Sequence, residues 1–168
     1  MSRPLLVLVG PMGAGKSTVG RLLAERRDVA FRDTDDDVER TEGRSISDIF
    51  VDSGEEHFRA LEREAVARAL QEHAGVLAVG GGAVMQPETQ ALLAGHRVVF
   101  LRVGLTDAAA RVGLGTSRPL LLGNVRSTMK ALLDERTTVY EAVADASVDT
   151  DGRTPDEVAD LVEAALDE

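Results

Sequence analysis

A chain of 168 residues is long enough for one domain with a buried core and short for two. Its net charge of −10 at pH 7 argues against a nucleic-acid partner, because nucleic-acid-binding proteins normally present a basic surface. The lack of cysteine excludes disulfides, thiolate nucleophiles and cysteine-bound metals. The longest apolar runs are far shorter than the roughly 20 residues of a membrane-spanning helix, and the first residues show no signal-peptide pattern. We therefore expect a single cytoplasmic domain over residues 1–168, without a membrane partner.

Short apolar runs alternate with helix-like segments along the whole chain. The runs that suit buried strands are residues 5–9, 29–33, 76–79, 98–101 and 147–149. The segments with helical spacing or helix-start signals are residues 16–27, 45–50, 55–72, 106–112, 126–144 and 155 onward. Strands and helices that alternate in this way predict an α/β fold, with a parallel sheet covered by helices on both faces.

The first strand leads into a phosphate-binding motif. Residues 10–18 ("GPMGAGKST") fit the pattern G-x-x-x-x-G-K-[ST], which requires a strand before it and a helix after it. Glycines at this spacing let backbone N–H groups turn toward phosphate oxygens, and the helix dipole adds positive potential. Lys16 is expected to reach the terminal phosphates, and the Ser17 hydroxyl to ligate Mg²⁺. The residues expected to contact the nucleotide through this loop are Gly13, Ala14, Gly15, Lys16, Ser17 and Thr18.

Nucleotide binding leaves three classes open: a small-molecule kinase, a GTPase switch, and an ATPase or nucleotide-sensing module. A GTPase switch needs an N-K-x-D guanine-binding motif, and the only asparagine, Asn124, is followed by Val125. An ordinary P-loop ATPase would place an aspartate at the end of a core strand, whereas the strand at 76–79 runs into the glycines at 80–82. A kinase accounts best for a second binding surface built from aspartates, arginines and glycines.

The strand at 29–33 ends in a dense group of carboxylates, "DTDDD" at 33–37. Carboxylates repel one another, so either this segment is solvated or cations and hydrogen-bond donors lie against it. Asp36 and Asp37 fall where a helix should begin, and a helix dipole stabilises carboxylates in the first turn. In the same strand Arg32 occupies a position where an apolar residue would be expected. This arginine predicts that the strand lies at a sheet edge or bends there.

Residues 112–124 join two helix-like segments and contain glycines and a Ser-Arg-Pro step. A connection of this length within a compact domain is usually functional or mobile, so we expect a lid here. A closed lid would exclude water that otherwise hydrolyses the nucleotide.

The ordered set of motifs resembles that of the shikimate kinases over nearly the whole chain. The matching stretches are "GPMGAGKST", "DTD" at 33–35, "FRALE" at 58–62, "GGG" at 80–82, "RPLL" at 118–121 and the arginine at 136. The resemblance implies a P-loop fold of the nucleoside-monophosphate-kinase-like type, a three-layer sandwich around five parallel strands with a mobile lid. It also implies transfer of the γ-phosphoryl group of ATP to the 3-hydroxyl of shikimate, with Mg²⁺, in aromatic amino-acid biosynthesis. We expect the protein to be a monomer. A gluconate- or nucleotide-directed kinase and a non-catalytic nucleotide-binding module are the alternatives.

The resemblance assigns roles at the reacting centre. Asp33 is expected to hold Mg²⁺ through water, and Asp35 to orient or deprotonate the attacking hydroxyl. The glycine run follows a strand, where the backbone must approach the substrate closely. The glycines expected to contact the substrate are Gly80, Gly81 and Gly82.

Two arginines match those that bind the substrate carboxylate in the family, Arg59 and Arg136. A planar guanidinium is the best partner for a carboxylate. Considered without the resemblance, Arg59 would pair with Glu62 or Glu55 on a helix surface, and such a pair need not compete with substrate binding. The helical region that binds the substrate is expected at about residues 35–62.

Further arginines match the nucleotide side of the family's site. Arg118 on the lid is expected to reach the transferring phosphate and to stabilise its charge in the transition state. Arg111 and Arg153, with Pro155, match the residues that stack on the adenine ring.

Overall fold

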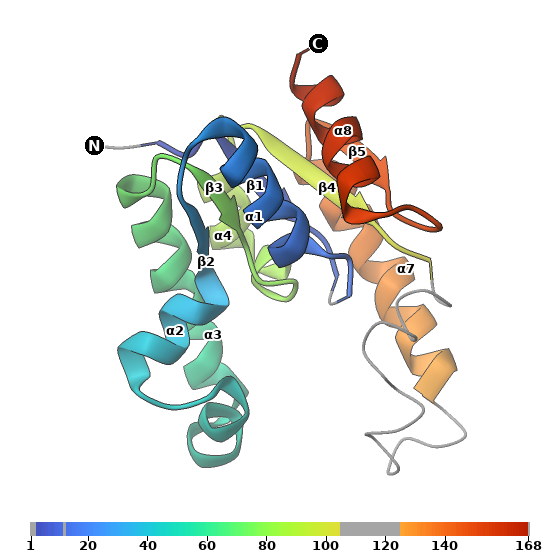
Figure 1. The fold of residues 1–168 in the computed structure, drawn as a ribbon. Coiled ribbons are helices and arrows are strands. Elements are labelled where there is room, and N and C mark those ends of the chain that lie inside the picture. Colours follow the sequence, from blue (N-terminus) through green and yellow to red (C-terminus); the bar gives the residue numbers. More distant parts are fainter. Residues whose placement is uncertain (1–2, 12, 105–124, 168) are drawn as a thin grey trace.

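The computed structural model describes residues 3–11, 13–104 and 125–167 and shows an α/β fold (Figure 1). The strands are β1 (Leu6–Val9), β2 (Phe31–Asp33), β3 (Val76–Ala78), β4 (Val98–Arg102) and β5 (Ala146–Asp149). The helices are α1 (Lys16–Arg27), α2 (Thr34–Glu42), α3 (Ile46–Glu72), the 3-10 helix η1 (Ala83–Met85), α4 (Pro87–Leu93), α7 (Val125–Val143) and α8 (Pro155–Leu166). None of the helices in these ranges is long and apolar enough to cross a bilayer. The helix expected at 106–112 and the lid expected at 112–124 lie outside the described residues.

The five strands form one sheet in the order β2-β3-β1-β4-β5, and every neighbouring pair is parallel. The central strand is β1, where Leu6 pairs with Val76 of β3 and Val7 pairs with Val98 of β4. All four residues of β1 are buried, as its continuous apolar run predicts. The parallel sheet expected from the sequence is therefore confirmed.

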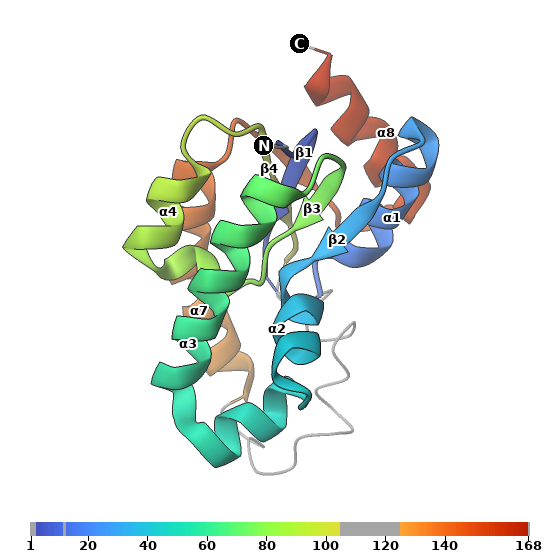
Figure 2. The same ribbon diagram turned by 90° about the vertical axis from the view of Figure 1, so that its left-hand side faces the viewer.

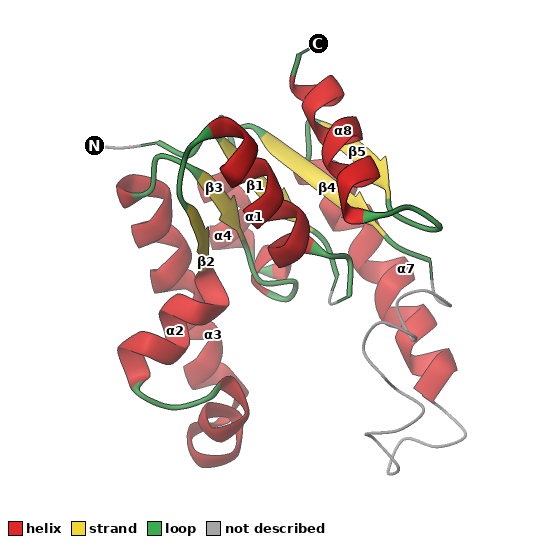
Figure 3. Cartoon of the chain, in the orientation of Figure 1, coloured by secondary structure: helices red, strands yellow, loops and turns green. Residues whose placement is uncertain are grey.

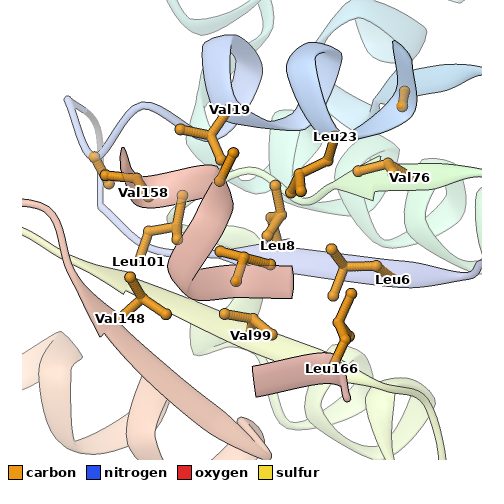
Figure 4. Packing of buried hydrophobic residues seen from close by; sticks show 14 residues of the cluster. Leu6, Leu8, Val19, Leu23, Val76, Val99, Leu101, Val148, Val158 and Leu166 are labelled. Atoms are coloured by element: carbon orange, nitrogen blue, oxygen red, sulfur yellow. The ribbon is translucent and has the colours of Figure 1, made fainter. Parts of the chain in front are cut away.

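Helices cover both faces of the sheet, which confirms the expected three-layer arrangement (Figures 2 and 3). On one face, α1 and α8 contribute Leu23 and Val158 to an apolar cluster that includes side chains of the strands (Figure 4). On the other face, α3, α4 and α7 contribute Val66, Leu93 and Tyr140 to a second cluster. The sheet is thus buried on both sides, and its strand ends remain available for a site.

A group of charges adds to the apolar contact between α1 and α8. The guanidinium of Arg26 on α1 lies 3.1 Å from Asp156, 2.8 Å from Asp160 and 3.1 Å from Glu163 on α8. Solvent and salt screen such pairs, so their contribution to stability is small compared with the apolar contact. They do specify which face of α8 meets the helix that follows the phosphate loop.

The charged residue of β2 has a specific structural role. β2 lies at one edge of the sheet, as Arg32 predicts. Nε of Arg32 donates to Asp37 at 2.7 Å, and Nη1 lies 3.2 Å from Glu72. Asp37 is buried and also accepts a hydrogen bond from Arg40 at 2.8 Å. Asp37 therefore does more than occupy the first turn of α2, because it neutralises two arginines in a partly buried network.

The helix starts follow the capping patterns, whereas two helix positions differ from expectation. Ser45 accepts the N–H of Asp48 at 3.1 Å, and Thr154 and Glu157 form the reciprocal capping box. The two helices expected at 45–50 and 55–72 lie in one element, α3, which Gly54 interrupts with φ 87° and ψ 168°. The sequence pattern does not predict η1 and α4, because helices of three and seven residues are too short to show a clear period.

Candidate active site

The phosphate loop connects the carboxyl end of β1 to the start of α1. β1 has β3 on one side and β4 on the other, and open parallel sheets bind ligands beyond the strand ends at such a point. Gly10 opens the loop with φ 151°, and a Cβ there would lie 2.6 Å from the carbonyl oxygen of Leu101. Gly15 precedes α1 in the left-handed region with φ 90°. Both positions therefore require glycine, which is the physical reason for these two letters of the motif.

Lys16 lies in the first turn of α1 and folds back over the loop. Its Nζ donates hydrogen bonds to the carbonyl oxygens of Gly10 at 2.7 Å and Pro11 at 3.2 Å. Burial lowers the pKa of Lys16, while the carboxylates of Asp35 and Asp33 act in the opposite direction. The ammonium group is thereby held at the position where the motif requires a cation for phosphate charge.

Ser17 and Asp33 meet at the carboxyl end of the sheet. The hydroxyl of Ser17 donates to Oδ2 of Asp33 at 2.9 Å, although the two residues lie on different elements. The second carboxylate oxygen of Asp33 accepts the backbone N–H of Asp35 at 2.9 Å and caps α2. A hydroxyl and a carboxylate beside a phosphate loop are hard oxygen ligands, which Mg²⁺ prefers. These residues therefore fit a Mg²⁺ site that phosphate oxygens and water would complete.

Asp35 lies in the first turn of α2, within reach of the phosphate loop. Burial raises its pKa to about 6, the charges of Asp33 and Glu62 add to this rise, and Lys16 opposes it. A Cβ at Gly80 would lie 2.6 Å from Oδ1 of Asp35, so this glycine leaves room for the carboxylate. A carboxylate with a pKa of about 6 is ionised at neutral pH and accepts a proton more readily than an ordinary aspartate.

The sequence predicts that Asp35 orients or deprotonates the attacking hydroxyl, and in the second role its raised pKa sets the pH dependence of turnover. Only the ionised carboxylate can accept a proton, so we expect kcat/KM for the acceptor to decline as the pH falls through about 6. An aspartate with an ordinary pKa would keep its activity down to about pH 4. Initial rates of ADP release at saturating Mg-ATP, measured between about pH 5 and pH 8, would check the prediction. An unchanged kcat/KM down to about pH 5 would contradict it.

Arg59 and Glu62 form an ion pair on α3. Nη1 of Arg59 lies 2.7 Å from Oε1 of Glu62, whose side chain is only 3% exposed. Burial raises the pKa of Glu62, and Arg59, Gln86 and Arg136 oppose that rise. A Cβ at Gly82 would overlap the guanidinium of Arg59, so Arg59 lies directly against the glycine run. The pairing of Arg59 with Glu62 is confirmed, but Glu62 is buried and Arg59 is only partly exposed, so the pair is not the solvated one expected on a helix surface.

Tyr140 connects three elements around the same region. It is fully buried on α7, one turn after Arg136, and its hydroxyl donates to the carbonyl oxygen of Gly81 at 2.8 Å. Burial raises the pKa of Tyr140 to about 12, and the charge of Arg136 acts in the opposite direction. Its ring packs on Phe100 of β4, with 5.0 Å between the ring centroids. Tyr140 thus joins the helix that carries Arg136 to the glycine run and to the sheet.

A pocket of about 570 Å³ brings the predicted groups together, a size typical of small-molecule sites. Gly81 and Gly82 line it, and the rings of Phe50 and Phe58, 4.7 Å apart between centroids, form an apolar wall. The charged and hydroxyl-bearing residues that matter for chemistry in this pocket are Lys16, Ser17, Asp33, Asp35, Arg59 and Arg136. The phosphate loop and the two arginines thus border one cavity, with carboxylates between them.

Comparison with known proteins agrees with this geometry. A family model described as shikimate kinase matches residues 12–167. The shikimate kinase of Thermobifida fusca (strain YX) is 58% identical over 165 residues, which cover 98% of this chain and 96% of that protein. The chain belongs to the shikimate kinase family. A second family member, the shikimate kinase of Salinispora arenicola (strain CNS-205), is 61% identical and is covered to 98%, with 97% of this chain matched.

A solved structure extends the comparison to the fold. The shikimate kinase from Acinetobacter baumannii in complex with shikimate has a TM-score of 0.87 to this chain at 34% identity. The match covers 97% of this chain and 92% of that protein. The five-stranded parallel sheet with its helices is therefore the fold of the shikimate kinase family, as the motifs imply.

Gly80 and Ala14 are both expected to contact ligands, but their backbone N–H groups donate to other atoms of the protein. Gly80 donates its N–H to Oγ1 of Thr34 at 3.1 Å. Ala14 is a buried residue of the phosphate loop, and its N–H donates to the carbonyl oxygen of Pro11 at 3.1 Å. Among the described residues, neither Gly80 nor Ala14 lines the 570 Å³ pocket, so both support the site through bonds within the protein.

Of the residues expected at the adenine ring, Arg153 and Pro155 lie where the connection from β5 enters α8. Pro155 is the first residue of α8, and Arg153 is exposed, with a hydrogen bond from Nη1 to the carbonyl oxygen of Asp149 at 3.2 Å. Arg111, the expected partner of Arg153, and the lid residue Arg118 lie outside the described residues.

Three residues at or near the site make contacts that the sequence motifs do not predict. Thr34 lies between Asp33 and Asp35, and its position in the sequence does not indicate that its hydroxyl accepts the N–H of Gly80. Tyr140 is the only tyrosine of the chain and follows Arg136 by four residues, a spacing that would place both on one face of a helix. Gln86 has no such signal, because its contacts depend on a helix that the sequence does not predict.

Proposed function

We propose that the protein is a Mg²⁺- and ATP-dependent shikimate kinase, which converts shikimate and ATP to shikimate 3-phosphate and ADP for aromatic amino-acid biosynthesis. The observation that carries this proposal is that Lys16 and Ser17 of the phosphate loop share a pocket with Asp35, Arg59 and Arg136. Lys16 supplies a cation for the phosphates of ATP. Asp35 supplies a carboxylate for the reacting hydroxyl of shikimate, and Arg59 and Arg136 supply two guanidiniums for its carboxylate.

On the nucleotide side, Lys16 neutralises charge on the terminal phosphates of ATP, and the loop N–H groups hold their oxygens. Ser17 and Asp33, whose side-chain oxygens lie 2.9 Å apart, would hold Mg²⁺, Ser17 as a direct ligand and Asp33 through water. Bound Mg²⁺ supplies neutralisation of phosphate charge, as in kinases generally. Gly13, Gly15 and Thr18 line the pocket beside Lys16 and complete the cradle.

On the acceptor side, Asp35 accepts the hydrogen bond of the 3-hydroxyl and takes its proton as the phosphoryl group is transferred. Its raised pKa supports this role, because a base near the operating pH is the most effective. Arg59 and Arg136 bind the shikimate carboxylate, and Gly81 and Gly82 let the ring approach the backbone. Holding both ends of the acceptor aligns the hydroxyl with the phosphorus atom, which is most of what a kinase must do.

The remaining elements close the site. The helical region at about 35–62 holds the acceptor, and a lid at about 112–124 brings Arg118 onto the transferring phosphate. Arg111, Arg153 and Pro155 hold the adenine ring by stacking. The enzyme works as a single-domain monomer in the cytoplasm, with small-molecule substrates and without nucleic-acid or membrane partners.

The proposal is tested by ADP release from Mg-ATP with shikimate, gluconate, AMP or no acceptor. We expect release that depends on shikimate, and we expect it to be lost in Lys16→Met, which controls for contaminating kinases. Nucleotide binding without turnover on any acceptor would favour a non-catalytic module. Turnover that requires gluconate or AMP would keep the fold and overturn the acceptor.

A further inference from the structure

We propose that Gln86 is a positioning residue for Arg59, the arginine that meets the acceptor carboxylate. The inference rests on the proposed function, because that function gives Arg59 its substrate role. It concerns a residue of the β3–α4 connection that no motif marks.

Gln86 occupies the N-cap position of α4, where a side chain commonly accepts a backbone N–H of the first turn, yet it makes no such bond. Its side chain instead reaches α3. Nε2 donates to Oε1 of Glu62 at 3.2 Å and to the carbonyl oxygen of Arg59 at 3.4 Å. Its Oε1 accepts from Nη1 of Arg63. The contact with Arg63 orients the amide, so that its two N–H groups face Glu62 and Arg59.

The oxygen of Glu62 that Gln86 contacts is also the oxygen that binds Arg59. Oε1 of Glu62 accepts from Arg59 at 2.7 Å and from Gln86 at 3.2 Å. Because the carboxylate is buried, it cannot replace a lost donor with bulk water, and its orientation depends on these partners. Gln86 therefore holds Glu62 in place, and Glu62 in turn holds the guanidinium of Arg59.

Gln86 acts on the substrate through Arg59 and not directly. It borders a neighbouring pocket of about 830 Å³, which Arg59, Gly82 and Arg136 also border, whereas it does not line the 570 Å³ pocket that contains Lys16 and Asp35. Gln86 thus influences binding of the acceptor carboxylate through Arg59, and it does not contact the reacting hydroxyl or the phosphates. Its loss should affect binding of the acid and leave the chemical step nearly unchanged.

The test compares Gln86→Leu with a matched variant, Gln90→Leu. Gln90 is also a half-buried glutamine on this segment, and its Nε2 donates to the carbonyl oxygen of Val84 at 3.0 Å, away from α3. We expect Gln86→Leu to raise KM for shikimate roughly tenfold, as the loss of a hydrogen bond to a charged group does, with kcat and KM for ATP within about twofold. We expect Gln90→Leu to leave all three constants within about twofold of the wild type.

Gln86→Glu is the second variant, since it is nearly isosteric and places an acceptor where Glu62 needs a donor. It should also raise KM for shikimate, and it decides the question if Gln86→Leu does not fold. An unchanged KM in the folded variant, or an equal loss in Gln90→Leu, would overturn the proposal. The wild-type acceptor assay is run first, so an acceptor other than shikimate is recognised separately. The same comparison is then made with the acid that the wild type uses.

Discussion

Replacing Asp35 with asparagine is expected to lower kcat by about 10²–10⁴-fold, the usual contribution of a positioned general base. Asparagine keeps the size of the side chain and can still contact a hydroxyl, but it cannot take the proton. ADP affinity should stay close to that of the wild type, because the phosphate loop lies on a different element. Steady-state rates of ADP release would give kcat, and calorimetric titration would give the affinity for ADP.

The matched control is Asp36→Asn, the next residue in the same turn of α2. Asp36 is exposed, so its loss should leave kcat within a few-fold of the wild type. Turnover by Asp35→Asn at the wild-type rate would remove Asp35 from the chemistry. A loss of both turnover and ADP binding would point instead to a disturbed phosphate loop.

Asp35→Asn should also make the ligand-free protein more stable at neutral pH. The folded state raises the pKa of Asp35 from 3.8 to about 6, so folding favours the protonated form. Stability is therefore lost as the pH rises between these two values, and the full cost is present above about pH 6. Asparagine avoids this cost, and we expect a gain of about 1–2 kcal/mol after allowance for partial solvent exposure. Thermal unfolding at about pH 7.5 and pH 4 should show the gain at the higher pH alone.

Arg59→Ala is expected to raise KM for shikimate on the order of 100-fold, because a charge-assisted contact to the carboxylate is lost. KM for ATP should change little, since Arg59 lies on α3 and pairs with Glu62, whereas the phosphate-binding groups lie on the loop before α1. Arg59→Lys should recover only part of the loss, because lysine keeps the charge but not the planar pair of donors. Initial rates over a grid of shikimate and ATP concentrations would separate the two constants.

Arg68→Ala is the control for Arg59→Ala. Arg68 lies on the same helix, and its pair with Glu64 at 3.5 Å is solvent-exposed, so its removal should leave both constants unchanged. Arg59→Ala also leaves Glu62 buried without its cation, which is destabilising. The double variant Arg59→Ala/Glu62→Gln removes the stranded charge, and a high KM in a well-folded double variant would attribute the effect to binding. A change confined to KM for ATP would reassign Arg59 to the nucleotide.

The features that the sequence predicts well are those that depend on neighbouring residues. The phosphate loop needs glycine at 15 because the backbone there is left-handed, and β1 is recognisable because both its faces are buried. Arg32 predicts the edge position of β2 because a guanidinium cannot be buried in the centre of a sheet without partners.

The features that it predicts poorly depend on contacts between distant elements. Glu62 looks like a surface residue in the run of charges on α3, yet it is buried and accepts a hydrogen bond from Gln86 on another connection. The role of Tyr140 depends on a carbonyl 59 residues away in the chain. The break at Gly54 is visible as a gap between two helical patterns, but the direction in which the second helix continues is not.

The contact between α1 and α8 has a consequence for biosynthesis of the enzyme. Arg26 and Asp160 are separated by 134 residues, so a ribosome must add most of the chain before α8 can cover the apolar side of α1. Until then Val19 and Leu23, beside the phosphate loop, lack the covering that Val158 and Val162 provide. A nascent chain that already contains the whole phosphate loop therefore still exposes apolar surface, and such chains are targets for chaperones. The nucleotide site is encoded early but can become fully packed only near the end of translation.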